Sequence, residues 1–397
     1  MPFPPHRPLG EPRFVERNGE PFVFFEEDPA GLTPGTMQMP MLTFFVYAHL
    51  DGTLDAQGVS DAIDKTTGGR AKLPPEVIEK IVAELDRHFL LQNERTAVRR
   101  AVVLETFAKS PSRPAKFVPV PAEVLTPAID EMYRAKQGAG PIDRARSGGS
   151  VRGIVAPHID FHRGGPVYTH AYKQVAESAG AETYLVLGVA HRSPPSPFVL
   201  STKAYETPLG TAEVDVDFTE RLLKRAGRDC LEHEIAHLGE HSVEFQAVQL
   251  KHARAGRAPF KIVPILCSMF DDPAAAPVSD FISALEETMR GRSICVVAGV
   301  DFAHVGPNFG DEKPVTEETI DWICKEDRKS LAEVAAVDAG AFWQIVTDGE
   351  NKLNVCGLTA TYTALRLLAG TKGELLCYSY APAPKQSVVS FASAVFR

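Results

Sequence analysis

The runs GIVAPHID (residues 153–160), LVLGVAHR (185–192) and VVAGVDFAHV (296–305) decide the fold of this 397-residue chain. Each is a short stretch of aliphatic and β-branched residues with a histidine at or near its end, and FKIVPILCS (260–268) has the same apolar character. Continuous apolar runs of this length are typical of strands that are buried on both faces. They predict a buried sheet in the second part of the chain.

Helical stretches separate these apolar runs. We expect helices over residues 167–178, 218–226 and 275–289, and a last strand over 387–396. Strands that alternate with helices indicate an α/β domain. We therefore predict an α/β fold over residues 151–397, with a mostly parallel central sheet flanked by helices.

The chain before residue 151 has a different pattern. Residues 1–110 combine a Pro- and Gly-rich arm (1–40) with a small helical module. An apolar helical stripe supports this module, and its members are Ile78, Ile81, Val82, Leu85, Phe89 and Leu90. The layout resembles winged-helix or PqqD-like modules, and it fits equally a small packing domain with no partner of its own. Residues 111–150, rich in Pro, Gly and Arg, predict a linker with one helix near 128–135.

Composition excludes two classes of partner. The net charge is −9 and the pI is near 5.8, and short basic stretches do not form the clustered basic face that nucleic-acid binding requires. No apolar run approaches the roughly 18 to 20 residues of a membrane helix, and the N-terminus lacks the apolar core of a signal peptide. The six cysteines show no CxxC spacing, which favours reduced thiols. We expect a cytoplasmic protein that binds neither nucleic acid nor membrane.

Polar side chains follow the predicted strands at the point where each strand ends. His158 and His191 follow two strands, and Asp301 and His304 follow a third. Ligands of open α/β sheets bind beyond the carboxyl ends of the strands, so these side chains are expected to share one pocket. Neutral imidazoles bind Fe, Cu or Zn, and a carboxylate or thiolate completes a three-ligand site. Asp160 is a candidate to orient an imidazole; the alternative for each histidine alone is a hydrogen-bonded structural imidazole.

A second pattern competes with this pocket. HEIAH (233–237) has the letters of the HExxH zinc-peptidase motif. Gly239 lies one residue too early for the extended metzincin motif, whose glycine would stand at Glu240. A zinc metallopeptidase is therefore the less favoured alternative.

Five motifs in order resemble the Memo family, called AmmeMemoRadiSam system protein B in prokaryotes. They span residues 153–397 and are GIVAPHID, LVLGVAHR with a downstream ETPLG (206–210), EHSVEFQ (240–246), VVAGVDFAHVG (296–306) and NVCGLTATYTAL (354–365). The resemblance implies a fold like that of the LigB-type class III extradiol dioxygenases, which hold non-haem Fe(II) with two histidines and a carboxylate.

The resemblance also implies roles for individual residues. His158 and His191 correspond to the two metal-binding histidines, and His304 corresponds to the acid/base of the dioxygenases, with Asp301 beside it. Memo proteins supply a cysteine as third ligand where the dioxygenases supply a glutamate, and here that cysteine is Cys356. A helix N-terminus and a bound cation both lower the pKa of a thiol and so favour the thiolate. A His2Cys site suits Cu as well as Fe(II), with Zn as a further option.

Two classes of function follow. The first is a metal-dependent redox or dioxygenase-like enzyme that acts on a small molecule or a peptide. In this enzyme Glu240, His241 and Glu244 would line the pocket, and Asp160 and Asp301 would tune the imidazoles. The family's pairing implies radical-SAM and AMMECR-domain proteins as partners. The second is a non-catalytic binding or scaffold protein that keeps a vestigial dioxygenase pocket.

Overall fold

The computed structural model describes residues 1–9, 12–17, 20–25, 32, 37–192 and 194–397. The chain divides into two compact units, Met1–Ser110 and Pro111–Arg397. Part of the predicted arm of residues 1–40 lies outside the described residues. In the part of the chain that is described, no helix is both long and apolar enough to cross a membrane.

The first unit packs helices against a small antiparallel sheet, whose described strands are β1 (Arg13–Arg17), β2 (Glu20–Phe25) and β3 (Met37–Pro40). Its helices are α1 (Met41–Ala48), α2 (Ala56–Thr66), α3 (Pro75–Arg87) and α4 (Glu94–Lys109). The predicted apolar stripe is real on α3, where Ile78, Val82 and Leu85 are buried in the core of this unit. Phe89 lies beyond the end of that helix.

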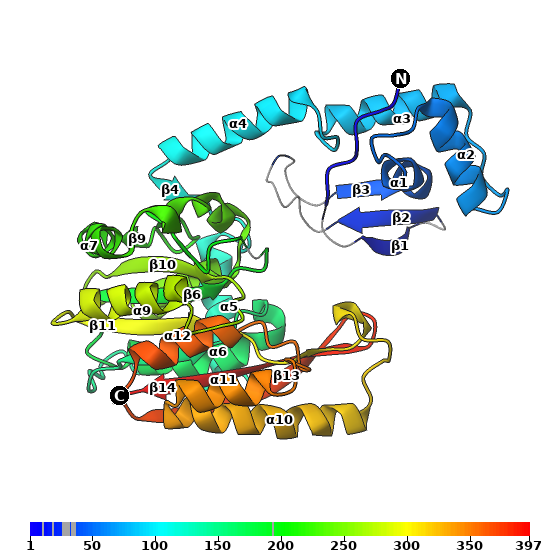
Figure 1. The fold of residues 1–397 in the computed structure, drawn as a ribbon. Helices are drawn as coiled ribbons and strands as arrows, with labels where there is room; N and C mark the ends of the chain where they lie inside the picture. The colour runs from blue at the N-terminus through cyan, green and yellow to red at the C-terminus, as the bar shows by residue number, and fades with distance from the viewer. Residues whose placement is uncertain (10–11, 18–19, 26–31, 33–36, 193) are drawn as a thin grey trace. The chain divides into compact units, whose positions relative to one another are not determined.

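The second unit is built on one mixed sheet (Figure 1), for which the described residues give nine strands. Four neighbouring central strands run parallel, and they are β5 (Gly153–Ala156), β11 (Ile294–Gly299), β6 (Thr183–Val189) and β10 (Lys261–Cys267). The short strand β9 (Glu213–Val214) also runs parallel to β10. The antiparallel pairings involve β7 (Phe198–Leu200), β12 (His304–Val305), β13 (Gly373–Ala383) and β14 (Ser387–Phe396).

The prediction of a mostly parallel sheet is therefore right for the centre and wrong for the edges. One of the antiparallel pairings has a local cause, because only residues 384–386 connect β13 to β14, and Lys385 and Gln386 both have φ of +55°. Positive φ at successive turn residues is typical of the short hairpin turns that match the twist of two antiparallel strands. A connection this short pairs β13 directly with β14.

Helices cover both faces of the sheet and define two cores (Figure 1). One face packs against α5 (Ala122–Arg134), α6 (Phe161–Ala176) and α8 (Ser242–Ala253). The other packs against α7 (Val216–Ala226), α9 (Ala276–Met289), α10 (Glu317–Ala336), α11 (Ala339–Thr347) and α12 (Leu358–Leu367). Alternate residues of β6 supply the two cores, with Leu185 and Leu187 on one face and Tyr184 and Val186 on the other. This two-sided burial explains the unbroken apolar runs of the sequence.

Residues 111–150 belong to the second unit and are not a free linker. The strand β4 (Ser112–Arg113) pairs with β8 (Ala204–Tyr205). Helix α5 begins earlier than predicted and buries Leu125, Ile129 and Tyr133. These three apolar residues recur every fourth position, and that helical stripe outweighs the Pro-rich composition on which the linker prediction was based.

A buried carboxylate joins α10 to the β13–β14 hairpin. Oδ2 of Asp327 accepts hydrogen bonds from the hydroxyls of Tyr378 (2.7 Å) and Ser390 (2.5 Å). Among the described residues, Oδ1 of Asp327 has no hydrogen-bond partner. Burial is the largest influence and raises the pKa of Asp327 from 3.8 to about 6.

This pKa predicts a pH-dependent stability. The folded state holds the Asp327 proton more tightly than the unfolded chain, so the carboxyl group destabilises the fold progressively as pH rises from about 4 to above 6. Between pH 5 and pH 8 we expect it to lower the free energy of unfolding by about 1.5 kcal/mol. Urea unfolding of Asp327→Asn at both pH values should show a pH dependence smaller by this amount. The control is Asp321→Asn on the exposed face of α10. An equal pH dependence of the free energy of unfolding in the unaltered chain, Asp327→Asn and Asp321→Asn would contradict the prediction.

Candidate metal centre

Three histidines meet at the carboxyl edge of the parallel strands. His158 lies two residues after β5, His191 lies two residues after β6, and His241 immediately precedes α8. One ring nitrogen from each comes within 4.8 Å of those of the other two. Donor atoms bound to one ion lie roughly 3 to 4 Å apart when each bond is about 2.0 to 2.3 Å. The three imidazoles therefore fit a shared metal ion after small side-chain movements.

His158 has a fixed orientation at the base of the cluster. Its Nδ1 donates to the carbonyl oxygen of Gly299 at 2.9 Å, and its backbone N–H donates to Oδ1 of Asp301 at 3.0 Å. Because Nδ1 carries the proton, Nε2 keeps its lone pair. Burial, together with the nearby His191 and His241, holds the pKa of His158 well below its usual value. The ring is therefore neutral at pH 7 and available as a ligand.

Glu240 orients His191. Both carboxylate oxygens of Glu240 lie 3.0 Å from Nδ1 of His191, and they also accept from the backbone N–H groups of His191, His241 and Ser242. Burial raises the pKa of Glu240, but the adjacent His191 outweighs this effect and the pKa lies well below its usual range. Glu240 is thus an ionised hydrogen-bond acceptor beside the cluster. Burial lowers the pKa of His191, but Glu240 outweighs this effect and raises that pKa well above its usual value, so a metal ion at Nε2 of His191 would displace a proton.

Removing this carboxylate is expected to weaken metal binding. Partners that orient a metal-bound histidine typically contribute about 10- to 100-fold in affinity. Glu240→Gln should therefore reduce the affinity for Co(II) or Zn(II) by that factor, measured by competition with a chromophoric chelator. The control is Glu234→Gln, because Glu234 accepts from Ser201 and Thr202 and not from the cluster. Equal affinities of Glu240→Gln and the control would refute an orienting role.

Cys356 places a thiol beside the histidines. Its Sγ lies 3.5 Å from Nε2 of His158 and 3.7 Å from the carbonyl oxygen of Asp301. Gly357 follows it and precedes α12. A Cβ at Gly357 would lie 2.6 Å from Cβ of Val300, so a glycine lets the turn approach the end of β11 closely. Burial raises the pKa of Cys356, although a hydrogen bond with His191 opposes the shift.

Asp301 and His304 lie beside the cluster. Oδ2 of Asp301 is 3.8 Å from Nε2 of His158, and burial raises the pKa of Asp301 to about 7. Nδ1 of His304 donates to the carbonyl oxygen of Phe302 at 3.0 Å, and its ring packs edge-on against Phe309. Burial lowers the pKa of His304 to about 4. At pH 7 the His304 ring is therefore neutral, and the backbone of Asn354 is a second hydrogen-bond partner of this side chain.

Two predicted pocket residues have other contacts. The carboxylate of Asp160 caps α6 and pairs with His162 and Arg163, so it does not orient a cluster imidazole. Glu244 is fully buried, and it accepts from the backbone N–H groups of residues 116–118 and from Arg113 at 2.5 Å. These contacts join α8 to the segment of residues 113–118.

Sequence reasoning missed Arg113. This fully buried arginine also donates to the carbonyl oxygens of His237 and Glu240, at 2.6 and 2.9 Å. It thereby ties β4 to the loop that carries Glu240 and His241. The Pro-rich composition around Arg113 gave no sign that this residue is buried. The one available signal was a basic residue in a short run that could pair with a sheet edge.

The HEIAH segment does not form a zinc-peptidase site. Residues Glu234–Gly239 form a 3-10 helix, whereas the motif needs an α-helix that presents both histidines on one face. Both ring nitrogens of His237 have partners, the Tyr205 hydroxyl at 2.6 Å and the Val199 carbonyl oxygen at 2.9 Å. The local geometry contradicts the metallopeptidase alternative.

The fold and the site define a mixed α/β protein with a cluster of histidines at the carboxyl edge of its parallel strands. The model of the Memo family, described as "Memo-like protein", matches residues 115–395. A "MEMO1 family protein" of Aquifex aeolicus (strain VF5) is 29% identical over 386 residues, which cover 95% of this chain and 96% of the relative. Another, of Methanopyrus kandleri, is 30% identical over 298 residues, which cover 73% of this chain and 99% of the relative.

The chain belongs to the Memo family. The family match begins at residue 115, close to the start of the second unit. It therefore includes most of the segment that was predicted to be a linker. The alignment with the Aquifex aeolicus protein reaches further and includes most of the first unit.

Proposed function

We propose that this protein binds a redox-active metal ion, Fe(II) or Cu, with Zn as a further option, and uses it in a redox or dioxygenase-like reaction. The observation that carries the proposal is the meeting of three imidazoles with the Cys356 thiol 3.5 Å from His158. His158, His191 and Cys356 would hold the metal, and His241 offers a fourth donor. Mixed imidazole and thiolate ligands suit copper and iron. When bound, the metal would supply electron transfer or Lewis-acid chemistry.

The proposed acid/base chemistry belongs to His304 and Asp301. A neutral imidazole can take a proton from a substrate hydroxyl group, and the low pKa of His304 requires that this hydroxyl group be acidic, as it would be on a metal ion. Asp301, whose pKa is raised to about 7 by burial, can hold or release a proton near neutral pH. The two residues therefore suit a substrate that must lose protons as it binds, such as a small molecule with adjacent hydroxyl groups. The fold would be similar to that of the LigB-type dioxygenases.

A second candidate function is non-catalytic metal binding or scaffolding. Three imidazoles and one thiol are enough to complete a four-coordinate site, and structural metal sites are closed in this way. A catalytic site needs an open position for substrate. The four neighbouring donors are the observation that favours this second candidate.

A Co(II)-loaded protein distinguishes the two candidates. A thiolate–Co(II) absorption band in the near ultraviolet that is absent from Cys356→Ser would support the cysteine ligand. A change in the visible spectrum on adding azide would indicate an open position, and oxygen uptake by the Fe(II)-loaded protein with catechols would support the enzyme. A spectrum insensitive to azide, with no oxygen uptake, would favour the closed site. Failure to bind Co(II), Cu or Fe(II) would overturn both candidates.

We also propose a cytoplasmic setting and partnership with radical-SAM and AMMECR-domain proteins. The support is membership in the Memo family, whose prokaryotic name joins the three components. Co-purification of the three proteins from one expression host, with the partners individually tagged, tests this proposal. No retention of either partner on the tagged chain would count against it.

A further inference from the structure

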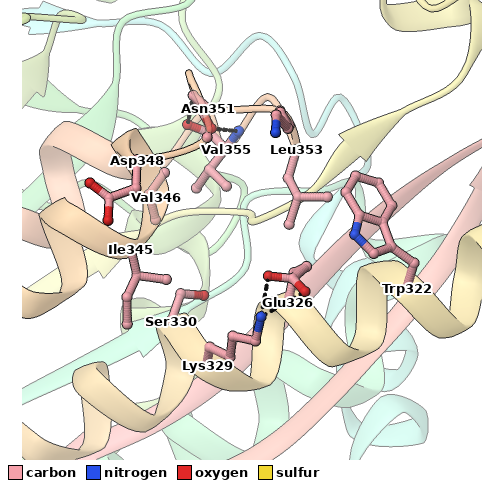
Figure 2. Close-up of a pocket in the computed structure, with 12 residues that line it drawn as sticks. Trp322, Glu326, Lys329, Ser330, Ile345, Val346, Asp348, Asn351, Leu353 and Val355 are labelled. Atoms are coloured by element: carbon pink, nitrogen blue, oxygen red, sulfur yellow. Dashed lines mark hydrogen bonds and ion pairs between the residues drawn. The ribbon is translucent and has the colours of Figure 1, made fainter.

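A cavity of about 470 Å³ lies outside the metal centre, between α10, α11 and the loop that leads to Cys356 (Figure 2). Helix α10 contributes Trp322, Glu326, Lys329 and Ser330, and the rest of the lining comes from residues 345–355. Its volume falls within the range of small-molecule sites, about 300 to 1,000 Å³. The cavity is large enough for a ring system of one or two rings.

The lining favours a neutral ligand. Glu326 and Lys329 form an ion pair at 2.7 Å within the cavity, so each neutralises the other. The Ser330 hydroxyl donates to the backbone carbonyl oxygen of Asp327. The other charges of the lining are one acid and one base, Asp348 and Lys352. With its charges balanced in this way, the cavity offers no excess charge to an anion or a cation.

An exposed tryptophan indicates an aromatic ligand. The side chain of Trp322 is 38% exposed on a helix whose outer face is otherwise charged. Figure 2 shows Trp322 at one end of the cavity, and Leu353 pointing from the loop toward α10. Aliphatic side chains of Ile345, Val346 and Val355 line the cavity as well. An indole beside an aliphatic wall accepts a flat ring, because aromatic pairs gain from stacking in addition to burial.

The loop that lines the cavity is hydrogen-bonded to His304, which lies beside the metal centre. The backbone N–H of His304 donates to the carbonyl oxygen of Leu353 at 2.7 Å, and the Asn354 side-chain amide donates to the carbonyl oxygen of His304 at 3.2 Å. Asn351 accepts from the backbone N–H of Val355, the residue before Cys356. Asn351 and Asn354 have φ of +52° and +46°. Non-glycine residues held in this region store strain, which is frequent in ligand clamps.

We propose that this cavity binds a neutral, flat aromatic molecule and that its occupancy changes the metal centre through residues 351–356. The cavity is separate from the histidine cluster, so the ligand is distinct from a substrate held at the metal. The first part of the proposal stands on the cavity alone. The second part rests on the proposed metal-binding function.

Binding is tested on the full metal-free chain with 5-fluoroindole as the probe, followed by fluorine NMR. We expect saturable one-to-one binding, and Trp322→Ala should weaken it by about tenfold because the stacking partner is lost. The matched control is Tyr380→Ala, which removes an aromatic residue of similar exposure, 45% against 38%, outside the cavity. Tighter binding of benzoate than of 5-fluoroindole would overturn the neutral class. Absence of saturable binding, or equal binding by Trp322→Ala and the control, would overturn the site.

Coupling is tested with the Co(II)-loaded protein. At a 5-fluoroindole concentration of about twice the dissociation constant of the unaltered chain, the Co(II) absorption spectrum should shift in the unaltered chain and in Tyr380→Ala. The shift in Trp322→Ala should be several-fold smaller, because that variant binds the probe about tenfold more weakly. Binding of the probe without any spectral shift would overturn the coupling and leave the cavity site standing. If the probe binds but the chain binds no metal, the proposed function fails and the cavity site survives, so the two failures can be told apart.

Discussion

His158→Ala is expected to reduce the affinity for Co(II) or Cu by more than about 100-fold while leaving the fold intact. Loss of an orienting partner alone typically costs about 10- to 100-fold, and this change removes a ligand itself. His158 is the one cluster histidine in contact with both Asp301 and the Cys356 thiol. Affinity is measured by competition with a chelator, and metal content after dialysis by elemental analysis.

The control for this change is His162→Ala. His162 lies four residues away, its side chain is 80% exposed, and it pairs with Asp160 outside the cluster. Full metal content is expected for this variant. A second variant, His158→Gln, keeps a polar side chain. It tests whether a loss of metal affinity in His158→Ala comes only from the cavity that alanine leaves. Unchanged affinity in both His158 variants would show that His158 is not a ligand.

The sequence predicted part of this site because parallel strands end at a common edge. His158 and His191 each follow a buried apolar run, so their approach required only that the two strands run parallel. His304 also follows a predicted strand, and its acid/base role was implied by the family resemblance. Cys356 was assigned by that resemblance alone, and its Sγ lies 3.5 Å from Nε2 of His158. These residues could be found because a strand pattern or a motif marked them.

The residues that sequence reasoning placed wrongly depend on contacts between distant segments. His241 was expected among the residues that line the pocket, and its ring lies in the cluster itself. The Ser242 hydroxyl at the start of α8 donates to the carbonyl oxygen of Val189 at the end of β6, which brings His241 to this edge. Asp160 is close to His158 in sequence, yet it caps α6 and turns toward Arg163. Glu240 takes the orienting role that was expected of Asp160. Such contacts have no periodicity and no local sequence signal.

The same distinction holds for the fold. Buried strands and amphipathic helices were predicted because their periodicity is local. The antiparallel edge depends on a hairpin turn at Lys385 and Gln386, two residues without the usual Asn-Gly signal. The assignment of residues 111–150 to the second unit depends on α5 and β4, which are short elements between prolines. The composition of this segment predicted a linker, but the packing of α5 and the pairing of β4 determine its structure.

Arg113→Met is expected to lower the free energy of unfolding of the second unit by about 3 to 5 kcal/mol. Arg113 and Glu244 form an ion pair with both side chains fully buried. Removing one partner of a buried pair leaves an uncompensated charge, and breaking such pairs costs about this much. The change also removes the donors to the carbonyl oxygens of His237 and Glu240. Urea unfolding monitored by circular dichroism measures the effect.

Arg113→Met also distinguishes residues that support the metal centre from residues that bind the metal. Since Arg113 holds the loop that carries Glu240 and His241, metal affinity should fall together with stability, whereas His158→Ala should lower affinity alone. The double variant Arg113→Met/Glu244→Gln removes both charges and should recover part of the lost stability. The surface control is Arg134→Met, whose exposed pair with Glu131 should contribute less than about 1 kcal/mol. A loss no larger than that of the surface control would mean that the backbone N–H groups of residues 116–118 alone satisfy Glu244, and that β4 does not support the metal centre.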